Sequence, residues 1–133
     1  MIAGSLAAMM VMNQHPAQLH IVLTAGNPPY FHSQYQRIIN WAEELFELKI
    51  PLSKALHLHT PLTAASFGSV NRTVLNYIRT LAQLEGVITD PIYTAKLFMT
   101  AEDQIIKQDL KGNILVIHSG GGMGLMGFGE KLS

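Results

Sequence analysis

Residues 83–96, with the sequence QLEGVITDPIYTAK, carry the densest group of side chains that could do chemistry. Asp90 followed by Pro91 is typical of a helix start, because aspartate accepts hydrogen bonds from the first free N–H groups and proline fits the first turn. Tyr93 and Thr94 then lie in that first turn, where backbone N–H groups lack helical partners. The spacing fits a simple helix cap with a packed tyrosine as well as it fits a site that uses both hydroxyl groups.

A second candidate is the glycine-rich tail, residues 119–129, which contains six glycines. Residues 122–127 (GMGLMG) match the G-x-G-x-x-G pattern of dinucleotide-binding turns. That motif needs a complete βαβ unit and an acidic residue about 20 positions later, whereas the sequence ends at Ser133. A flexible loop that lets the backbone approach a neighbour closely is therefore favoured. A third interpretation is a loop that lines a ligand at the carboxyl end of a parallel strand.

Histidines, carboxylates and cysteines give no metal centre. His57 and His59 lie two residues apart on a short expected strand, so both point to one face of the sheet. A metal ion needs a third ligand, and none is evident nearby, so ordinary surface or half-buried imidazoles are favoured. His118 ends an apolar run and is expected to be a hydrogen-bonded core histidine. The chain has no cysteine, which excludes disulfides, thiolate ligands and a thiol nucleophile.

Composition excludes several classes of protein. The 133 residues are 48% hydrophobic and 14% charged, with a formal net charge of zero. This balance argues against intrinsic disorder and against nucleic-acid binding. The longest apolar run, residues 2–12, is shorter than the about 20 residues that a membrane-spanning helix needs. The absence of cysteine leaves the compartment open, and a cytoplasmic location is the default expectation.

Hydrophobic periodicity predicts the elements that position these residues. Four helices are expected: residues 2–13, residues 33–48, a helix that Asn71 caps and that ends at residue 84, and a helix from Asp90 to residue 108. Strands are expected over residues 19–25, 55–59 and 113–118. Strands that alternate with helices indicate an α/β fold with a mostly parallel sheet. Two firm strands make a poor sheet, and helix 2–13 is apolar on every face, so this fold is expected to be incomplete.

Three segments, spanning about half of the chain, resemble one enzyme family. Residues 83–96 resemble its LEG…DPVYTGK segment, residues 114–121 (ILVIHSGG) its VLFIHTGG strand and loop, and residues 67–71 (FGSVN) its YG-x-PN loop. The family comprises 1-aminocyclopropane-1-carboxylate (ACC) deaminase and D-cysteine desulfhydrase, which use pyridoxal phosphate. The resemblance implies a tryptophan synthase β-like fold, with helices on both faces of the sheet in three layers. Residues 1–133 would form one C-terminal fragment of it.

The resemblance also implies roles for individual residues. Tyr93 would be the active-site tyrosine near the cofactor ring, where it moves a proton or acts as a nucleophile. Ser119 matches the hydroxyl residue near the pyridine nitrogen of the cofactor. Thr94 stands where deaminases carry glutamate and desulfhydrases carry threonine. Three further residues are expected at the cofactor without an assigned role: Glu85, Gly86 and Gly120.

Thr94 points to one branch of the family. A carboxylate near the ring nitrogen favours its protonation and deepens the electron sink, whereas a hydroxyl leaves the nitrogen less basic and suits β-elimination. The first expectation is therefore conversion of D-cysteine to pyruvate, ammonia and hydrogen sulfide, with ACC deamination as the alternative. Phe67 stands in place of the family's second tyrosine, which puts the usual proton chemistry in doubt. A non-catalytic α/β binding module is the alternative from another class.

The resemblance places the covalent lysine and the phosphate-binding glycine loop of such enzymes upstream of the matched segments. The chain has six lysines, none in that motif: Lys49, Lys54, Lys96, Lys107, Lys111 and Lys131. The chain alone is therefore expected to be inactive. Its expected partners are a small amino-acid substrate and either a second copy or the missing N-terminal part, with no nucleic acid, membrane or metal.

Overall fold

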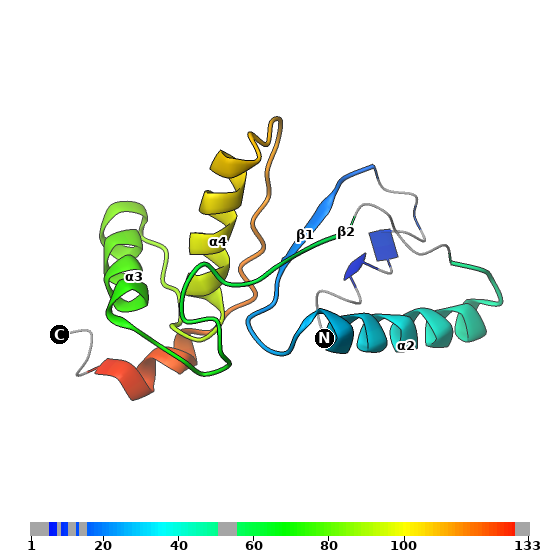
Figure 1. Cartoon of the computed structure of the whole chain (residues 1–133), viewed down its shortest axis with the longest axis horizontal. Helices are drawn as coiled ribbons and strands as arrows, with labels where there is room; N and C mark the ends of the chain where they lie inside the picture. Colours follow the sequence, from blue (N-terminus) through cyan, green and yellow to red (C-terminus); the bar gives the residue numbers. More distant parts are fainter. Residues whose placement is uncertain (1–5, 8, 11–12, 14–15, 51–55, 130–133) are drawn as a thin grey trace. The chain divides into compact units, whose positions relative to one another are not determined.

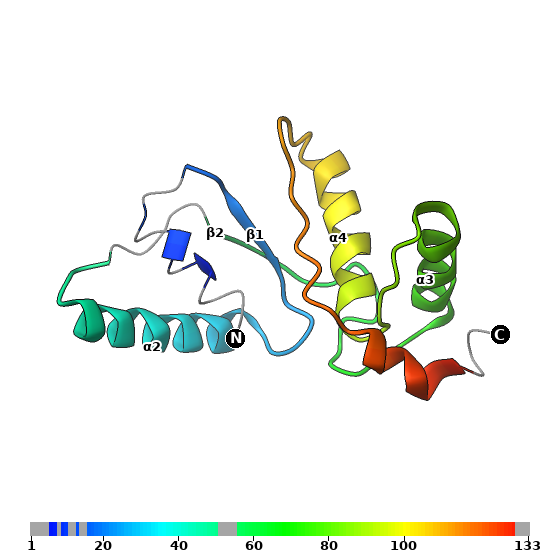
Figure 2. The same ribbon diagram turned by 180° about the vertical axis from the view of Figure 1, so that it is seen from behind.

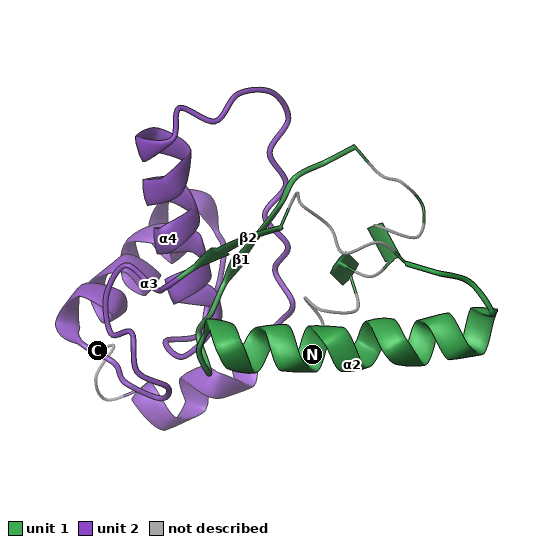
Figure 3. Cartoon of the chain, turned by 45° about the vertical axis from the view of Figure 1, so that its right-hand side comes forward, with its two compact units in different colours: residues 1–59 green, residues 60–133 purple. Residues whose placement is uncertain are grey.

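The computed structural model describes residues 6–7, 9–10, 13, 16–50 and 56–129. Its elements are β1 (Leu19–Val22), α2 (Pro28–Phe46), β2 (Leu56–His59), α3 (Arg72–Glu85), α4 (Thr94–Lys107) and the 3₁₀-helix η1 (Gly122–Phe128) (Figure 1). The chain divides into two compact units, Met1–His59 and Thr60–Ser133 (Figure 3). Within the described ranges no helix is long and apolar enough to cross a membrane.

Unit 1 is built on a parallel pair of strands. β1 and β2 pair with Leu19 opposite Leu56 and Val22 opposite His59. Alternate residues of each strand face the core because successive side chains of a strand point to opposite faces. The predicted α/β class with a parallel sheet is confirmed, and the described part of that sheet has two strands. The buried core of the unit consists of Ala7, Ile21, Leu23, Phe31, Tyr35, Ile39, Ala42 and Ile50.

Helix α2 begins five residues before the predicted start at Ser33. The side chain of Asn27 accepts a hydrogen bond from the Tyr30 N–H at 2.9 Å and so caps the helix. Pro28 and Pro29 occupy the first turn, where no N–H is needed. The sequence Asn-Pro-Pro resembles a turn, but here it is a helix start. The hydroxyl of Ser33 donates to the carbonyl of Tyr30 within the helix instead of capping it.

The predicted helix over residues 2–13 falls partly outside the described residues. Residues 6–7 and 9–10 are helical, whereas residues 2–5, 8, 11 and 12 lie outside the described part. Ala7 is buried in the core of unit 1, but the side chain of Met9 is 61% exposed. The expectation that this helix is buried on every face is therefore wrong at Met9.

Three histidines stack on the sheet of unit 1. The ring of His20 lies 4.5 Å from that of His57 and 5.2 Å from that of His59, centroid to centroid, with nearly parallel planes. Nδ1 of His20 is hydrogen-bonded to Nε2 of His59 at 3.0 Å. His57 and His59 are half-buried, as expected, but their stacking on His20 of β1 could not be predicted from their spacing. No three metal-binding side chains in the described ranges are placed to hold a metal ion.

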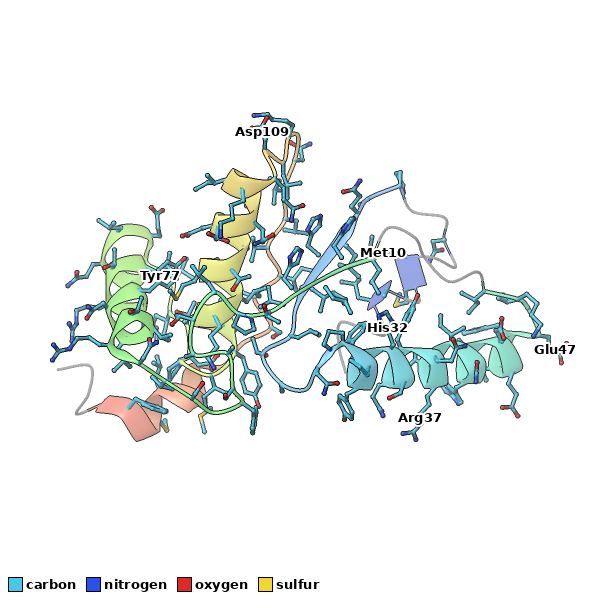
Figure 4. All side chains as sticks on the ribbon, viewed as in Figure 1. Met10, His32, Arg37, Glu47, Tyr77 and Asp109 are labelled. Atoms are coloured by element: carbon cyan, nitrogen blue, oxygen red, sulfur yellow. The ribbon has the colours of Figure 1, made fainter. Side chains whose placement is uncertain are left out.

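This stack predicts that unit 1 loses stability in mild acid. Burial, and then the charges of neighbouring histidines, lower the pKa of His20 and His59 below 6.5. The unfolded chain thus takes up more protons as the pH falls, so this stabilisation is complete above pH 6.5 and is lost below it. Urea unfolding at several pH values should show the loss. His20→Gln should flatten the dependence, whereas His32→Gln on exposed α2 (Figure 4) should not; equal curves would contradict the account.

In unit 2, helices α3 and α4 pack against each other, as Figures 1 and 2 show from opposite sides. The predicted Asn71 cap is confirmed, since its side chain accepts from the Val74 N–H at 3.0 Å. Gly86 ends α3 with a φ of 69°, a left-handed conformation that costs glycine little. The hydroxyl of Tyr77 on α3 (Figure 4) donates to Glu102 on α4 at 2.6 Å. The buried core residues are Val74, Ile78, Ala95 and Met99.

The predicted strand over residues 113–118 is wrong. This segment is extended alongside α4 (Figure 2) but belongs to no sheet among the described residues. Its apolar side chains stay exposed, Leu115 to 83%. A strand exists only when a neighbouring strand satisfies its backbone, and the described part of unit 2 contains no such neighbour. Apolar sequence alone therefore could not make this segment a strand.

Candidate functional site

The carboxylate of Asp90 organises the start of α4. One oxygen accepts hydrogen bonds from the N–H groups of Ile92 and Tyr93, at 2.9 and 2.8 Å. The other accepts from the N–H and the hydroxyl of Thr94, at 3.0 and 2.6 Å. The backbone N–H of Asp90 in turn donates to the Thr94 hydroxyl oxygen at 2.7 Å. Asp90 binds the start of the helix as expected, but its assignment as the N-cap is wrong, because residues 91–93 form a turn and α4 begins at Thr94 with Tyr93 as its N-cap.

These contacts keep Asp90 ionised inside the protein. Burial raises the pKa of its carboxyl group, but the hydrogen bonds from Thr94, Tyr93 and Ile92 lower the pKa by more, so the net shift is downward. Asp90 is almost fully buried, so its carboxylate does not face solvent. It therefore acts on what surrounds it rather than on a ligand in solution.

The glycine-rich segment closes over this carboxylate. A Cβ atom added to Gly121 would lie 3.0 Å from Cγ of Asp90, and one added to Gly124 would lie 3.1 Å from its Cβ. Gly121 also has a φ of 119°, which L-residues rarely adopt. The N–H of Gly124 donates to the carbonyl of Gly121 at 2.8 Å, which tightens the turn. Glycine is thus required here for close approach, as the second interpretation of the tail predicts.

His118 fastens the other end of this segment. Its Nε2 lies 2.9 Å from the carbonyl oxygen of Ile88, and the Gly120 N–H donates to its Nδ1 at 3.1 Å. The two contacts fit the tautomer with the proton on Nε2. His118 is hydrogen-bonded as expected but is exposed, so its assignment to the core was wrong. Together with Gly121 and Gly124 it joins residues 118–124 to residues 88–94.

Tyr93 stands at the surface of this junction. Its side chain is 46% exposed, and its ring lies 6.2 Å from the ring of Phe67, at an angle of 51°. Phe67 is itself 64% exposed. Two exposed aromatic rings in contact form a wall that a flat ligand could meet. Within the described part of the chain, the Tyr93 hydroxyl makes no hydrogen bond, so it is available to such a ligand.

The other predicted site residues are not all alike. Ser119 and Gly120 are exposed and directly precede Gly121, which lies against Asp90. Thr94 is buried, and its hydroxyl donates a hydrogen bond to the Asp90 carboxylate. Glu85 is the exposed last residue of α3, and Gly86 is its C-cap, with open space beside it. No contact among the described residues brings Glu85 or Gly86 to the Asp90 cluster.

Lys96 is the residue of this region that the sequence did not reveal. Its side chain is only 1% exposed, and its Nζ donates to the carbonyl of Ser66 at 3.3 Å. Burial lowers its pKa, while the charge of Asp90 raises it in part. The available signal was position, since Lys96 shares a helix face with Met99 and Thr100, three and four residues later, and both are buried.

The match to G-x-G-x-x-G does not mark a dinucleotide site. Residues 122–127 lie within η1, a 3₁₀-helix, rather than at a turn between a strand and an α-helix. The segment before it is not a strand either. The structural context that this fingerprint requires is therefore missing from the described residues, and the expectation of a flexible loop was wrong for residues 122–128.

Known proteins resemble the chain over most of its length. No protein-family model matches it. A Pyrococcus horikoshii protein, assigned provisionally as an ACC deaminase, is 33% identical over 100 residues, which is 75% of this chain and 30% of the relative. An ACC deaminase from Burkholderia ambifaria is 30% identical over 109 residues, 80% of this chain and 32% of the relative.

The structural comparison gives the same family. The crystal structure of an ACC deaminase homologue superposes with a TM-score of 0.82 and 26% sequence identity, over 98% of this chain and 39% of that one. The chain belongs to the ACC deaminase family. It spans about a third of the length of the relatives it matches. The recognition made from the motifs of residues 67–71, 83–96 and 114–121 is thus confirmed for this family.

The residues present fit part of a site for a phosphorylated aromatic cofactor. The exposed Tyr93–Phe67 wall and the exposed hydroxyl of Ser119 lie around a backbone segment that glycines hold against Asp90. The Thr89 hydroxyl beside Asp90 is fully buried without a hydrogen-bond partner within the described ranges. Buried polar atoms are usually hydrogen-bonded, so this hydroxyl is an exception beside Asp90.

Proposed function

We propose that the chain is part of a pyridoxal-phosphate-dependent enzyme that breaks bonds at the amino-bearing carbon of a small amino acid. The observation that carries the proposal is the junction of residues 88–94 with residues 118–124, which presents Tyr93 and Ser119 on motifs that resemble this family. Support for the cofactor comes from relatives named ACC deaminase. When bound, pyridoxal phosphate supplies the electron sink for such bond breaking.

The residues of this chain have distinct parts in the proposal. The Tyr93 phenol, exposed and next to Phe67, moves a proton to or from the substrate. The Ser119 hydroxyl hydrogen-bonds the ring nitrogen of the cofactor. Asp90 fixes the N–H groups of residues 92–94 and so holds the Tyr93 backbone in place. Because Phe67 has no hydroxyl, Tyr93 is the remaining phenol of the pair that the family motifs contain.

For the substrate we propose D-cysteine before ACC. The Thr94 hydroxyl is occupied by Asp90, and the Asp90 carboxylate is buried and accepts four hydrogen bonds, so neither one is placed to protonate a ring nitrogen. Threonine at position 94 has no carboxylate, and a site without that carboxylate suits β-elimination of a thiol. ACC deamination is the second candidate, because the matched relatives carry that name.

Product analysis separates the two substrates. The complete protein joins these 133 residues to the remaining length that the relatives have. Supplied with pyridoxal phosphate, it should release hydrogen sulfide and pyruvate from D-cysteine. Thr94→Ser, which keeps the hydroxyl that donates to Asp90, should keep sulfide release. α-Ketobutyrate from ACC without sulfide from D-cysteine would contradict the D-cysteine assignment. The absence of both products would contradict the enzymatic proposal and favour a binding module.

The isolated 133-residue chain should not hold the cofactor covalently. The two candidate amines inside the described α4 are unsuitable, since Lys96 is buried against Ser66 and Lys107 is paired with Asp103 at 2.9 Å. Borohydride reduction with pyridoxal phosphate, followed by mass spectrometry, should find no specific pyridoxyl-lysine. The complete protein should give one such lysine outside these residues. A single modified lysine in the isolated chain would contradict the assignment.

The proposal extends to assembly and location. We propose that a second copy of the protein or the remaining part of the relatives' length covers the exposed side chains of Ile114, Leu115 and Ile117. The predicted cytoplasmic location is kept as part of the same proposal.

A further inference from the structure

Lys96 is a buried cation that the proposed function does not use. Taking an ammonium out of water costs several kcal/mol unless nearby groups compensate it. The charge of Asp90 offsets that cost in part, and the Ser66 carbonyl accepts one hydrogen bond from Nζ. A neutral apolar side chain would fill the same space without this cost. The position of the charge therefore needs a reason other than packing.

The Ser66 carbonyl is one of the points that hold the loop between β2 and α3. The Leu62 N–H also ties this loop to α4, since it donates to the Thr100 hydroxyl at 3.0 Å. The Ser66 carbonyl accepts hydrogen bonds from the N–H of Ser69 at 3.1 Å, from the hydroxyl of Ser69 at 2.6 Å and from Lys96 at 3.3 Å. The first two bonds close the turn on itself. Only the bond from Lys96 connects this carbonyl to α4.

Phe67 directly follows that carbonyl and reaches the ring of Tyr93. Both rings are largely exposed, so the hydrophobic effect contributes little to holding them together. Tyr93 is the residue just before α4, and Lys96 lies in the first turn of the helix, three residues later. The start of α4 therefore carries one ring and binds the loop that carries the other.

We propose that Lys96 is a positioning residue, whose buried ammonium ties the Ser66 carbonyl to α4 and thereby holds Phe67 against Tyr93. Its consequence for catalysis rests on the proposed function, but the ring geometry does not. Asp90 and Lys96 then have different roles at the start of α4. Asp90 fixes the backbone of Tyr93 and the glycine segment, and Lys96 fixes the loop opposite.

Fluorine NMR can follow the ring contact in a protein of any size. 4-Fluorophenylalanine is placed at position 67 of the complete protein, and Tyr93→Leu defines the resonance position without the Tyr93 ring. Lys96→Met should move the resonance to that position, and Lys96→Arg, which keeps a buried donor and charge, should return most of the shift. Lys107→Met, at an exposed ion pair on the same helix, should leave it unchanged. An unmoved resonance in a folded Lys96→Met variant would overturn the proposal.

A second variant decides the matter if Lys96→Met does not fold. Ser69→Ala removes the hydroxyl that donates to the carbonyls of Ser66 and Ala64, at 2.6 and 2.7 Å, and leaves the bond from Lys96 in place. The fluorine resonance should then stay at the wild-type position. Its movement to the Tyr93→Leu position would mean that Ser69, not Lys96, holds the loop, and would overturn the proposal.

Kinetics separate this inference from the proposed function. In the complete enzyme, Lys96→Met should lower kcat by up to about 100-fold through misplacement of the rings. Cofactor affinity should change little, and Lys96→Arg should restore much of kcat. If no substrate reacts with the wild-type protein, the proposed function fails while the fluorine result still stands. Full kcat in a Lys96→Met enzyme would overturn the positioning role.

Discussion

Replacing Asp90 by alanine is expected to lower the free energy of unfolding by about 4 kcal/mol. The substitution removes the acceptor at the start of α4 and leaves the buried charge of Lys96 uncompensated. The substitution removes the acceptor for three N–H groups and the Thr94 hydroxyl at once. It also leaves Lys96 buried without the negative charge that offsets its burial. Because domains are stable by only about 5–15 kcal/mol, this loss is a large share of the total.

Asp90→Asn is the matched control for this prediction. The amide oxygen can still accept from Ile92 and Tyr93, but the charge and the acceptor for Thr94 are lost. Asp90→Asn should lower the free energy of unfolding by about 2 kcal/mol, half the cost of Asp90→Ala. This is the usual contribution of one hydrogen bond to a charged group. Urea unfolding followed by circular dichroism measures both variants at neutral pH. Equal stability of Asp90→Ala and the wild type would show that the carboxylate does not organise this site.

Gly121→Ala should both destabilise the chain and open the site. The new methyl group would collide with the Asp90 carboxylate, and the residue would keep a φ of 119° that alanine resists. Crowding of a packed site and backbone strain together should cost about 3 kcal/mol. The glycine segment must then move away from Asp90, and Ser119 moves with it. Loss of cofactor binding in the complete protein should therefore exceed what the loss of stability alone explains.

Gly120→Ala separates collision from strain. Gly120 has a φ of 99°, but an added Cβ would meet no atom within 4 Å. This variant should cost only about 1 kcal/mol, as expected for an L-residue in a left-handed conformation. Unfolding and cofactor titration of both variants give the comparison. If Gly120→Ala and Gly121→Ala behave alike, contact with Asp90 is not what requires glycine in this segment.

The parts of the fold that could be predicted are those fixed by local chemistry. Asn71 and Gly86 are caps whose side chain or backbone satisfies neighbouring N–H or C=O groups, so their sequence signals were sufficient. Asp90 does bind the helix start, but the turn over residues 91–93 moves the first helical residue to Thr94. The start of α2 was missed because Asn27-Pro28-Pro29 is compatible with both a turn and a helix. The strand over residues 113–118 was wrong because a strand depends on a partner that no local pattern reveals.

The same limit applies to the site. The need for glycine after His118 could be predicted from the glycine-rich sequence, whereas the roles of Tyr93 and Ser119 rest on the resemblance and stay predictions. The stack of His20 on His57 and His59 crosses two strands, and Lys96 reaches a carbonyl 30 residues earlier in the chain. Such contacts depend on the fold rather than on neighbouring residues. The placement of Thr94 against Asp90 likewise became visible only in three dimensions.

The most direct test of the central claim is to titrate pyridoxal phosphate into the complete protein and to measure binding by the visible absorbance of the cofactor. The account predicts one cofactor per protomer and much weaker binding in Gly121→Ala than in Gly120→Ala. A folded protein that contains these 133 residues and the upstream part, yet binds no pyridoxal phosphate, would contradict the claim that residues 88–94 and 118–124 form part of a cofactor site.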